Sequence, residues 1–345
     1  MALPHWNKII LLLVVATSLL SCQMDSQEKS GIESFSLEVP TGFPAPEIPE
    51  DNQLSNERVD LGKQLFYDTR LSANNSVSCA TCHKQKLAFA DSPPLSMGHN
   101  GKPGFRNAPT LANVAYQESF MMDGGVSSLA LQSLAPIHDR DEMGFDINKV
   151  VTKLNEDNEL KKMAKKAYDR DTLDAWVITR ALASFQRILI SGNSRYDQYA
   201  FQEKEEALTS EEKRGMELFF SEKTQCSSCH SDFNFSDGGF HNIGLYKSYD
   251  DPGRERITNQ AEDHGKFKTP TLRNIELTAP YMHDGSLTTL EEVIEHFNSG
   301  GINHQNLDPR VKALNLSQTE QSELIAFLKS LTDEEFVSNP EFELN

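Results

Sequence analysis

Cysteine is scarce in this chain, whose 345 residues include only five. Long apolar runs are missing too. The most apolar stretch, residues 9–20, is shorter than the roughly 20 residues that a membrane-spanning helix needs. Basic residues are also in the minority, with 33 Lys and Arg against 51 Asp and Glu and a net charge of −18. Such an acidic protein is a poor match for nucleic acid, and charge complementarity favours a partner with a basic patch.

The N-terminal segment predicts export. Lys8 precedes the short apolar run, and the run ends in Leu-Leu-Ser followed by Cys22. This order resembles the signal peptide and lipobox of bacterial lipoproteins, in which residues 1–21 are removed and Cys22 is acylated. An ordinary signal peptide with an unrelated cysteine is the alternative. We therefore expect a lipid-anchored protein on the periplasmic side of a bacterial membrane, joined to its anchor by a flexible tether, residues 22–53, that is rich in Pro and Glu.

The other four cysteines lie in two identical motifs, Cys79-Ala-Thr-Cys82-His83 and Cys226-Ser-Ser-Cys229-His230. Cys-x-x-Cys-His is the attachment motif of c-type haem. The two thiols bond to the two vinyl groups, and the adjacent histidine reaches the iron. Disulfides, a redox dithiol and a zinc site are alternatives, but none requires histidine directly after the second cysteine. The motifs predict two covalently bound haems c and no disulfide.

The two motifs lie in halves that share sequence. Residues 109–129 align without gaps with residues 270–290, and both segments contain Pro-Thr-Leu at the start and Asp-Gly later. This internal duplication predicts two cytochrome-c-like haem domains, residues 54–190 and 191–335, followed by a tail at residues 336–345.

Local patterns favour a mainly α fold. Apolar residues recur at helical spacing over 172–189, which predicts a buried helix face. Thr209, Thr289 and Ser317 are each followed three residues later by Glu, the pattern of a helix N-terminal capping box. Residues 91–108 and 231–270 have no such period. We expect them to be long loops around the haems.

Several segments together resemble the bacterial dihaem cytochrome c peroxidases, to which the dihaem enzyme that matures methylamine dehydrogenase is related. Besides the haem motifs, these are Leu-Phe-Tyr-Asp-Thr-Arg-Leu-Ser (65–72), Arg-Asn-Ala-Pro-Thr (106–110), Asn-Ser-Arg-Tyr-Asp (193–197) and Ala-Pro-Tyr-Met-His-Asp-Gly (279–285). The similarity covers residues 61–331.

The resemblance implies roles for individual residues. The haem of His83 would be the peroxide site, with His99 as a distal ligand that leaves on activation, and the haem of His230 would receive electrons. Glu142, assisted by Gln132, would move the proton during peroxide cleavage. A calcium ion between the haems would be bound by Asn107, Thr278 and Pro280. For His99, Glu142 and Gln132, the plain alternative is a solvated surface side chain.

Two positions depart from the family pattern. Met122 occupies the place of a tryptophan that lies between the haems, which leaves the route of electrons between them open. Phe297 occupies the place of the usual Met or Tyr ligand of the second haem and cannot bind iron. His296 and Met282 are the nearby substitutes.

The resulting expectation is a peroxidase that reduces hydrogen peroxide to water with electrons from a small redox protein, a cytochrome c or a cupredoxin. The alternatives are a dihaem electron carrier and a dihaem oxidase that acts on a partner protein. By analogy with relatives, the protein would form a homodimer.

Overall fold

The computed structural model describes residues 35–344 of the chain. The expected signal peptide, residues 1–21, and Cys22 lie outside these residues. Within the described part, no helix has the length and apolar character needed to cross a membrane.

The described chain is predominantly helical, with one short two-stranded sheet. Its α-helices are α1 (Asn56–Phe66), α2 (Cys79–Cys82), α3 (Leu129–Gln132), α4 (Leu134–His138), α5 (Ile147–Leu154), α6 (Asn158–Tyr168), α7 (Ala175–Arg187), α8 (Arg195–Phe201), α9 (Ser210–Phe219), α10 (Glu255–Thr258), α11 (Leu290–Ser299), α12 (Gln318–Lys329) and α13 (Glu334–Ser338). Strands β1 (Phe240–His241) and β2 (Phe267–Lys268) pair antiparallel, with Phe240 opposite Lys268. The expectation of a mainly α protein is confirmed.

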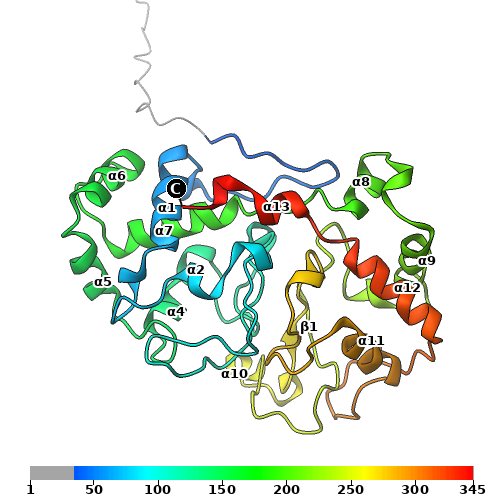
Figure 1. Cartoon of the computed structure of the whole chain (residues 1–345). Coiled ribbons are helices and arrows are strands. Elements are labelled where there is room, and N and C mark those ends of the chain that lie inside the picture. The colour runs from blue at the N-terminus through cyan, green and yellow to red at the C-terminus, as the bar shows by residue number, and fades with distance from the viewer. Residues whose placement is uncertain (1–34, 345) are drawn as a thin grey trace, which may run out of the picture. The chain divides into compact units, whose positions relative to one another are not determined.

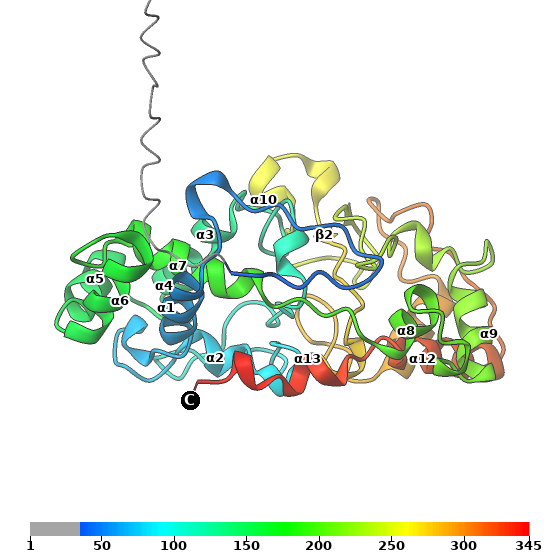
Figure 2. The ribbon, with the colours of Figure 1, turned by 90° about the horizontal axis from the view of Figure 1, so that it is seen from above.

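The helices gather in two groups with separate apolar cores. Helices α1, α5, α6 and α7 lie on one side, whereas α8, α9, α11 and α12 lie on the other (Figures 1 and 2). One core is built around Phe66, Phe185 and Leu182, and the other around Phe219, Phe327 and Leu324. The chain between the two groups is largely irregular, and this part carries the candidate site.

A glycine permits the closest helix contact in each group. A Cβ atom at Gly62 of α1 would overlap the carbonyl oxygen of Ala181 in α7, and one at Gly215 of α9 would overlap the carbonyl oxygen of Glu323 in α12. Gly62 lies 17 residues before Cys79, and Gly215 lies 11 residues before Cys226. Each lets the helix before its motif lie directly on the backbone of a second helix.

The predicted helix starts are confirmed. The side chains of Thr209, Thr289 and Ser317 each accept a hydrogen bond from the backbone amide of the Glu three residues on, and each Glu bonds back. The apolar pattern over 172–189 corresponds to α7, in which Val177, Ala181 and Phe185 are fully buried. Local sequence therefore determined these elements.

Residues 35–53 differ from expectation. We expected them to belong to a flexible tether, but Phe35 and Leu37 pack against the first core. The ring of Phe43 lies 4.7 Å from that of Phe233, and the Pro44 carbonyl accepts a hydrogen bond from Tyr116. The tether prediction is therefore wrong for this stretch. Its few apolar residues pack against the rest of the protein although they follow neither a helix nor a strand period.

The last residues also pack, although we expected a tail from residue 336 onward. Phe336 and Phe342 are buried in the first core, where both rings contact Phe89. Helix α13 carries the chain from α12 back toward α1 (Figure 2). The C-terminus thus belongs to the core of the N-terminal half, because its two phenylalanines complete that core.

Segments 109–129 and 270–290 have similar backbone conformations. Asn113 and Asn274 both have a positive φ, 60° and 59°, and each precedes a short 3-10 helix. The isolated strand pairing of Phe120 with Val126 has a counterpart in that of Tyr281 with Leu287. Each segment thus forms one compact loop with the same turn positions.

Candidate haem-binding site

A cavity of about 990 Å³ lies between the two helix groups, and both Cys-x-x-Cys-His motifs line it. This volume is at the upper end of the range typical of ligand pockets. The walls are formed largely by the irregular segments around residues 96–122 and 225–283. The segments without helical period thus form the walls of the cavity and position its functional side chains.

The two motif histidines have the same geometry. The Nδ1 atom of His83 donates to the Phe89 carbonyl at 2.8 Å, and that of His230 donates to the Phe235 carbonyl at 2.9 Å. Phe89 and Phe235 both adopt positive φ, 59° and 51°, which turns their carbonyls toward the imidazoles. With the proton on Nδ1, Nε2 keeps a free lone pair for a metal. Burial lowers the pKa of both histidines, which favours the neutral, ligating form.

The four motif cysteines are free thiols rather than disulfides. Burial raises the pKa of Cys79 to about 12 and also raises the pKa values of the other three thiols. Both pairs line the same cavity as their histidines.

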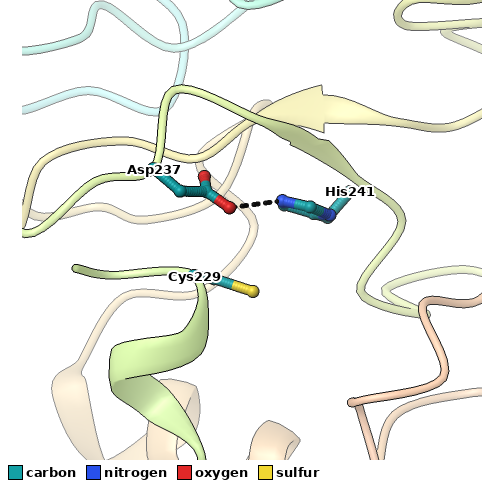
Figure 3. Close-up of side chains that lie close together, drawn as sticks. All are labelled: Cys229, Asp237 and His241. Carbon is teal, nitrogen blue, oxygen red and sulfur yellow. Dashed lines mark hydrogen bonds and ion pairs between the residues drawn. The ribbon is translucent and has the colours of Figure 1, made fainter.

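One of the motif cysteines also belongs to a cluster of possible metal ligands. Cys229, Asp237 and His241 lie close enough to hold a metal ion together (Figure 3). The Nε2 atom of His241 is 2.9 Å from Asp237, and its Nδ1 atom is 2.8 Å from Asp308. A thiol bonded to a vinyl group is no longer a thiolate ligand, so haem attachment would remove this metal set.

The donor set fits two c-type haems. Each motif offers two cavity-lining thiols and one neutral imidazole with a free Nε2 atom, and the surrounding wall is rich in Leu, Ile, Val, Phe and Met. Cys79, Cys82 and His83 would hold one group, and Cys226, Cys229 and His230 the other. Covalent haem with an axial histidine requires these atoms.

The structure brings both predicted proton-transfer residues to this cavity. Glu142 and Gln132 line it together with Cys79 and His83. Burial, with a smaller effect of the negative charge on Asp139, raises the pKa of Glu142 to about 7. A carboxyl group with this pKa can both accept and release a proton near neutral pH.

The structure does not place His99 in the cavity wall. Met97 and Gly98 line the cavity, whereas the His99 ring lies against Gly144, with Nε2 3.2 Å from the Arg140 carbonyl. In this arrangement the side chain of His99 contacts the backbone of Arg140 and Gly144 and does not face the cavity.

The three expected calcium ligands lie in the wall of the same cavity. Asn107, Thr278 and Pro280 all line the cavity. Asn107 is buried, and its Nδ2 atom donates to the Pro94 carbonyl at 3.0 Å. Because the amide nitrogen is used in this way, the Oδ1 atom is the part of the side chain suited to a cation.

The two atypical positions also lie in the wall. Met122 and Phe297 line the cavity, as does Met282. His296 does not line it, and its Nε2 atom donates to the Ile243 carbonyl at 3.0 Å. Of the two nearby substitutes for the second distal ligand, only Met282 therefore faces the cavity.

Sequence reasoning missed several polar residues of the wall. Lys268 extends into it, and burial lowers its pKa to about 8, while Nζ donates to Gln117 at 2.6 Å. Arg106 forms ion pairs with Asp123 at 2.8 Å and Asp251 at 2.6 Å. Arg106 could have been found from its place in the Arg-Asn-Ala-Pro-Thr segment, but nothing local marks Lys268.

Two haem-attachment motifs that open on one cavity of a helical fold define a class of di-haem c-type proteins. The chain belongs to the di-haem cytochrome c peroxidase family, whose model matches residues 56–206. Membership implies two c-type haems and an oxidoreductase.

The relatives carry two kinds of name. The methylamine utilization protein MauG of Methylorubrum extorquens is 38% identical, covering 83% of this chain and 81% of that protein. The cytochrome c551 peroxidase of Nitrosomonas europaea is 32% identical, covering 84% and 82%. A solved MauG-like protein associated with microbial copper homeostasis is 34% identical with a TM-score of 0.85, covering 90% of this chain and 99% of that one.

Proposed function

We propose that this protein reduces hydrogen peroxide to water with electrons from a small redox protein, a cytochrome c or a cupredoxin. The observation that carries the proposal is the position of Glu142, a carboxyl group with a pKa of about 7, in the cavity wall beside the first haem motif. Bound haem iron would supply the redox chemistry of peroxide cleavage, and the chain would supply proton transfer, orientation and access.

Glu142 moves the proton in this mechanism. Its carboxylate takes a proton from one oxygen of peroxide and gives it to the other oxygen, which then leaves as water. Gln132 holds the substrate from α3, with its Nε2 atom now 3.7 Å from the Met121 sulfur. Because both side chains come from elements of one half, that half is the peroxide site, and we assign His83 to it.

The other half receives electrons. His230 would be the iron ligand of this half, and the acidic chain, with net charge −18, favours a donor with a basic docking patch.

The two halves derive from an internal duplication. The matching backbone of residues 109–129 and 270–290 supports this proposal. Met282 is the candidate distal ligand on this side because it lines the cavity and His296 does not.

His99 would act as the removable ligand of a haem bound at His83. Its loop, residues 96–104, is a small hairpin in which Met97 pairs with Pro103. The side chain is turned to the Arg140 carbonyl, so the loop would have to move for His99 to reach a bound haem.

Calcium binds at Asn107, Thr278 and Pro280 and ties the two halves together. Support comes from the shared position of these residues in the cavity wall and from the orientation of the Asn107 amide. Oxygen donors from an amide and from backbone carbonyls suit this ion.

The protein acts on the periplasmic side of a bacterial membrane, held by lipid at Cys22, and it forms a homodimer. The location and the lipid anchor rest on the signal sequence alone, and the homodimer rests on analogy with relatives.

A further candidate function is the oxidation of a partner protein. The 38% identity to MauG and the similarity to a MauG-like structure favour it, and mass change in a co-expressed partner would detect it.

The decisive experiment is the Glu142→Gln variant, assayed as holoprotein for peroxide turnover with reduced cytochrome c. We expect a loss of roughly 100-fold or more, because a positioned acid–base group contributes this much, with both haem absorption bands kept. Glu156→Gln, at an exposed glutamate, is the control and should keep its rate. An unchanged rate in Glu142→Gln would exclude the proton-transfer role of this residue. If the wild-type protein had no peroxide turnover, electron transfer would be the remaining function.

A further inference from the structure

A short hydrogen bond joins two residues that the proposed function does not use. The hydroxyl group of Tyr246 donates to Asp284 Oδ2 at 2.5 Å. The other oxygen of the same carboxyl group, Oδ1, accepts a 3.1 Å hydrogen bond from the backbone amide of Ser286, which holds Asp284 in this orientation. The phenol proton of Tyr246 is therefore directed at a carboxyl oxygen that can accept it.

Aromatic side chains connect this tyrosine with the cavity. The Tyr246 ring centroid lies 5.6 Å from that of Tyr249 and 6.2 Å from that of His283. The His283 ring is stacked on Phe267, with centroids 4.0 Å apart and planes inclined by 20°. Tyr249, His283 and Phe267 all line the cavity, whereas Tyr246 does not and is only half-buried. Ring contacts thus run without interruption from the cavity wall to a phenol at the protein surface.

The equivalent carboxylate in the first half has a different partner. Asp123 occupies the position in residues 109–129 that Asp284 occupies in residues 270–290. Arg106 neutralises Asp123 with an ion pair of 2.8 Å. Because the same motif aspartate binds a guanidinium in one half and a phenol in the other, the pairing with Tyr246 is not a requirement of the shared turn.

We propose that Tyr246, with Asp284 as its proton acceptor, is a redox-active tyrosine at which a phenol donor is oxidised at the protein surface. The proposal rests on the proposed peroxide reduction, which provides the oxidant. Reduction of one peroxide to two waters consumes two electrons and two protons. In each of two identical steps, Tyr246 gives one electron through the aromatic contacts to the cavity, and its phenolic proton passes to Asp284.

The tyrosyl radical is then reduced at the surface. A phenol donor supplies one electron and its own hydroxyl proton leaves to solvent, while the proton on Asp284 returns to the Tyr246 oxygen. Two phenols are thus oxidised by one electron each for every peroxide, and the two protons consumed in forming water are replaced from solvent. A carboxylate within hydrogen-bond distance is needed because a phenol that loses an electron must also lose its proton.

The first test is electron paramagnetic resonance of the holoprotein, frozen shortly after mixing with one equivalent of hydrogen peroxide in the absence of a donor. We expect a tyrosyl signal in the wild type that is lost in Tyr246→Phe. In Asp284→Asn the rate of radical formation should fall by roughly 100-fold. Tyr67→Phe is the matched control, because Tyr67 is another half-buried tyrosine and its hydroxyl donates to a backbone carbonyl, that of Phe342, at 3.0 Å. The same signal in wild type and Tyr246→Phe would overturn the proposal.

The second test uses only the wild-type protein and so does not depend on how a variant folds. After repeated peroxide exposure, peptide mass spectrometry should find hydroxylated or cross-linked tyrosine at Tyr246, and added phenol should suppress it. Oxidation at other tyrosines but not at Tyr246 would overturn the assignment. If the protein consumes peroxide with reduced cytochrome c but forms no radical at Tyr246, only this inference fails. If it consumes no peroxide at all, the proposed function fails with it.

Discussion

The backbone amide of His99 donates a 2.7 Å hydrogen bond to the carbonyl oxygen of Glu142. The loop that carries the proposed removable ligand is thus tied to the residue that carries the proposed proton transfer. Gly98 makes this contact possible, since a Cβ atom there would overlap the carbonyl oxygen of Asp141. Movement of the loop and the position of the Glu142 carboxyl group are therefore mechanically linked.

Gly98→Ala should displace Glu142. Because a backbone carbonyl cannot move away as a side-chain end can, we expect the loop to shift and peroxide turnover to fall roughly 10- to 100-fold. Turnover and melting temperature of the holoprotein would be measured together. Gly104→Ala is the control in the same hairpin, since its Cβ would meet only the Ser96 carbonyl oxygen at 3.6 Å. Equal rates in both variants would show that the contact has no part in turnover.

Peroxide turnover should rise with pH through a midpoint near 7. Glu142 must be ionised to accept the proton, and burial raises its pKa to about 7, so the competent form is lost below this pH and gained above it. The measurement is the pH profile of kcat/KM for peroxide. Asp139→Asn removes a negative charge that raises this pKa, so its midpoint should move to lower pH. A profile that is flat from pH 5 to 9 would contradict the role of Glu142.

Removal of Arg273 should destabilise the protein severely. Its guanidinium forms ion pairs with Asp197 at 2.8 and 2.9 Å, and both side chains are fully buried. Arg273→Met leaves a buried carboxylate without its counter-ion, which costs about 3–5 kcal/mol. The free energy of unfolding from urea titration would measure it. Arg140→Met, at a side chain that is 90% exposed, should change stability by less than about 0.5 kcal/mol.

Calcium should bind to the holoprotein and depend on Asn107. After treatment with a chelator, we expect calorimetric titration to show one calcium site and readdition of the ion to restore peroxide turnover. Asn107→Ala should weaken the calcium affinity by at least about tenfold. Loss of a residue that binds the ion directly should reduce the affinity at least as much as loss of a residue that only hydrogen-bonds to a ligand. Asn148→Ala, at an exposed amide outside the cavity, is the control. Wild-type protein without calcium affinity would exclude the site.

The sequence predicted the local elements correctly where the signal was local. Capping boxes such as Thr289 with Glu292 depend on residues three apart, and the apolar face of α7 follows from its own period. The haem motifs likewise place two thiols and an imidazole within five residues. In all these cases the deciding contacts lie within a few positions of one another, so no knowledge of the fold was needed.

The irregular segments were beyond sequence reasoning. Phe35, Leu37 and Phe342 show no period, yet all three pack into the first core, because burial depends on which surface a segment meets and not on its own pattern. The same holds for Lys268, whose lowered pKa arises from desolvation in a cavity built by distant residues.

Sequence alone determined that this protein has two sites for covalent haem, each with its own histidine, because thiol spacing and an adjacent imidazole are properties of a short peptide. Only the tertiary structure decided that Glu142 lies beside the first of these sites with a pKa near neutrality, that His99 turns away, and that the phenol of Tyr246 meets Asp284. These relationships join residues up to dozens of positions apart, and they depend on burial and distance that arise only when the halves of the chain pack around one cavity.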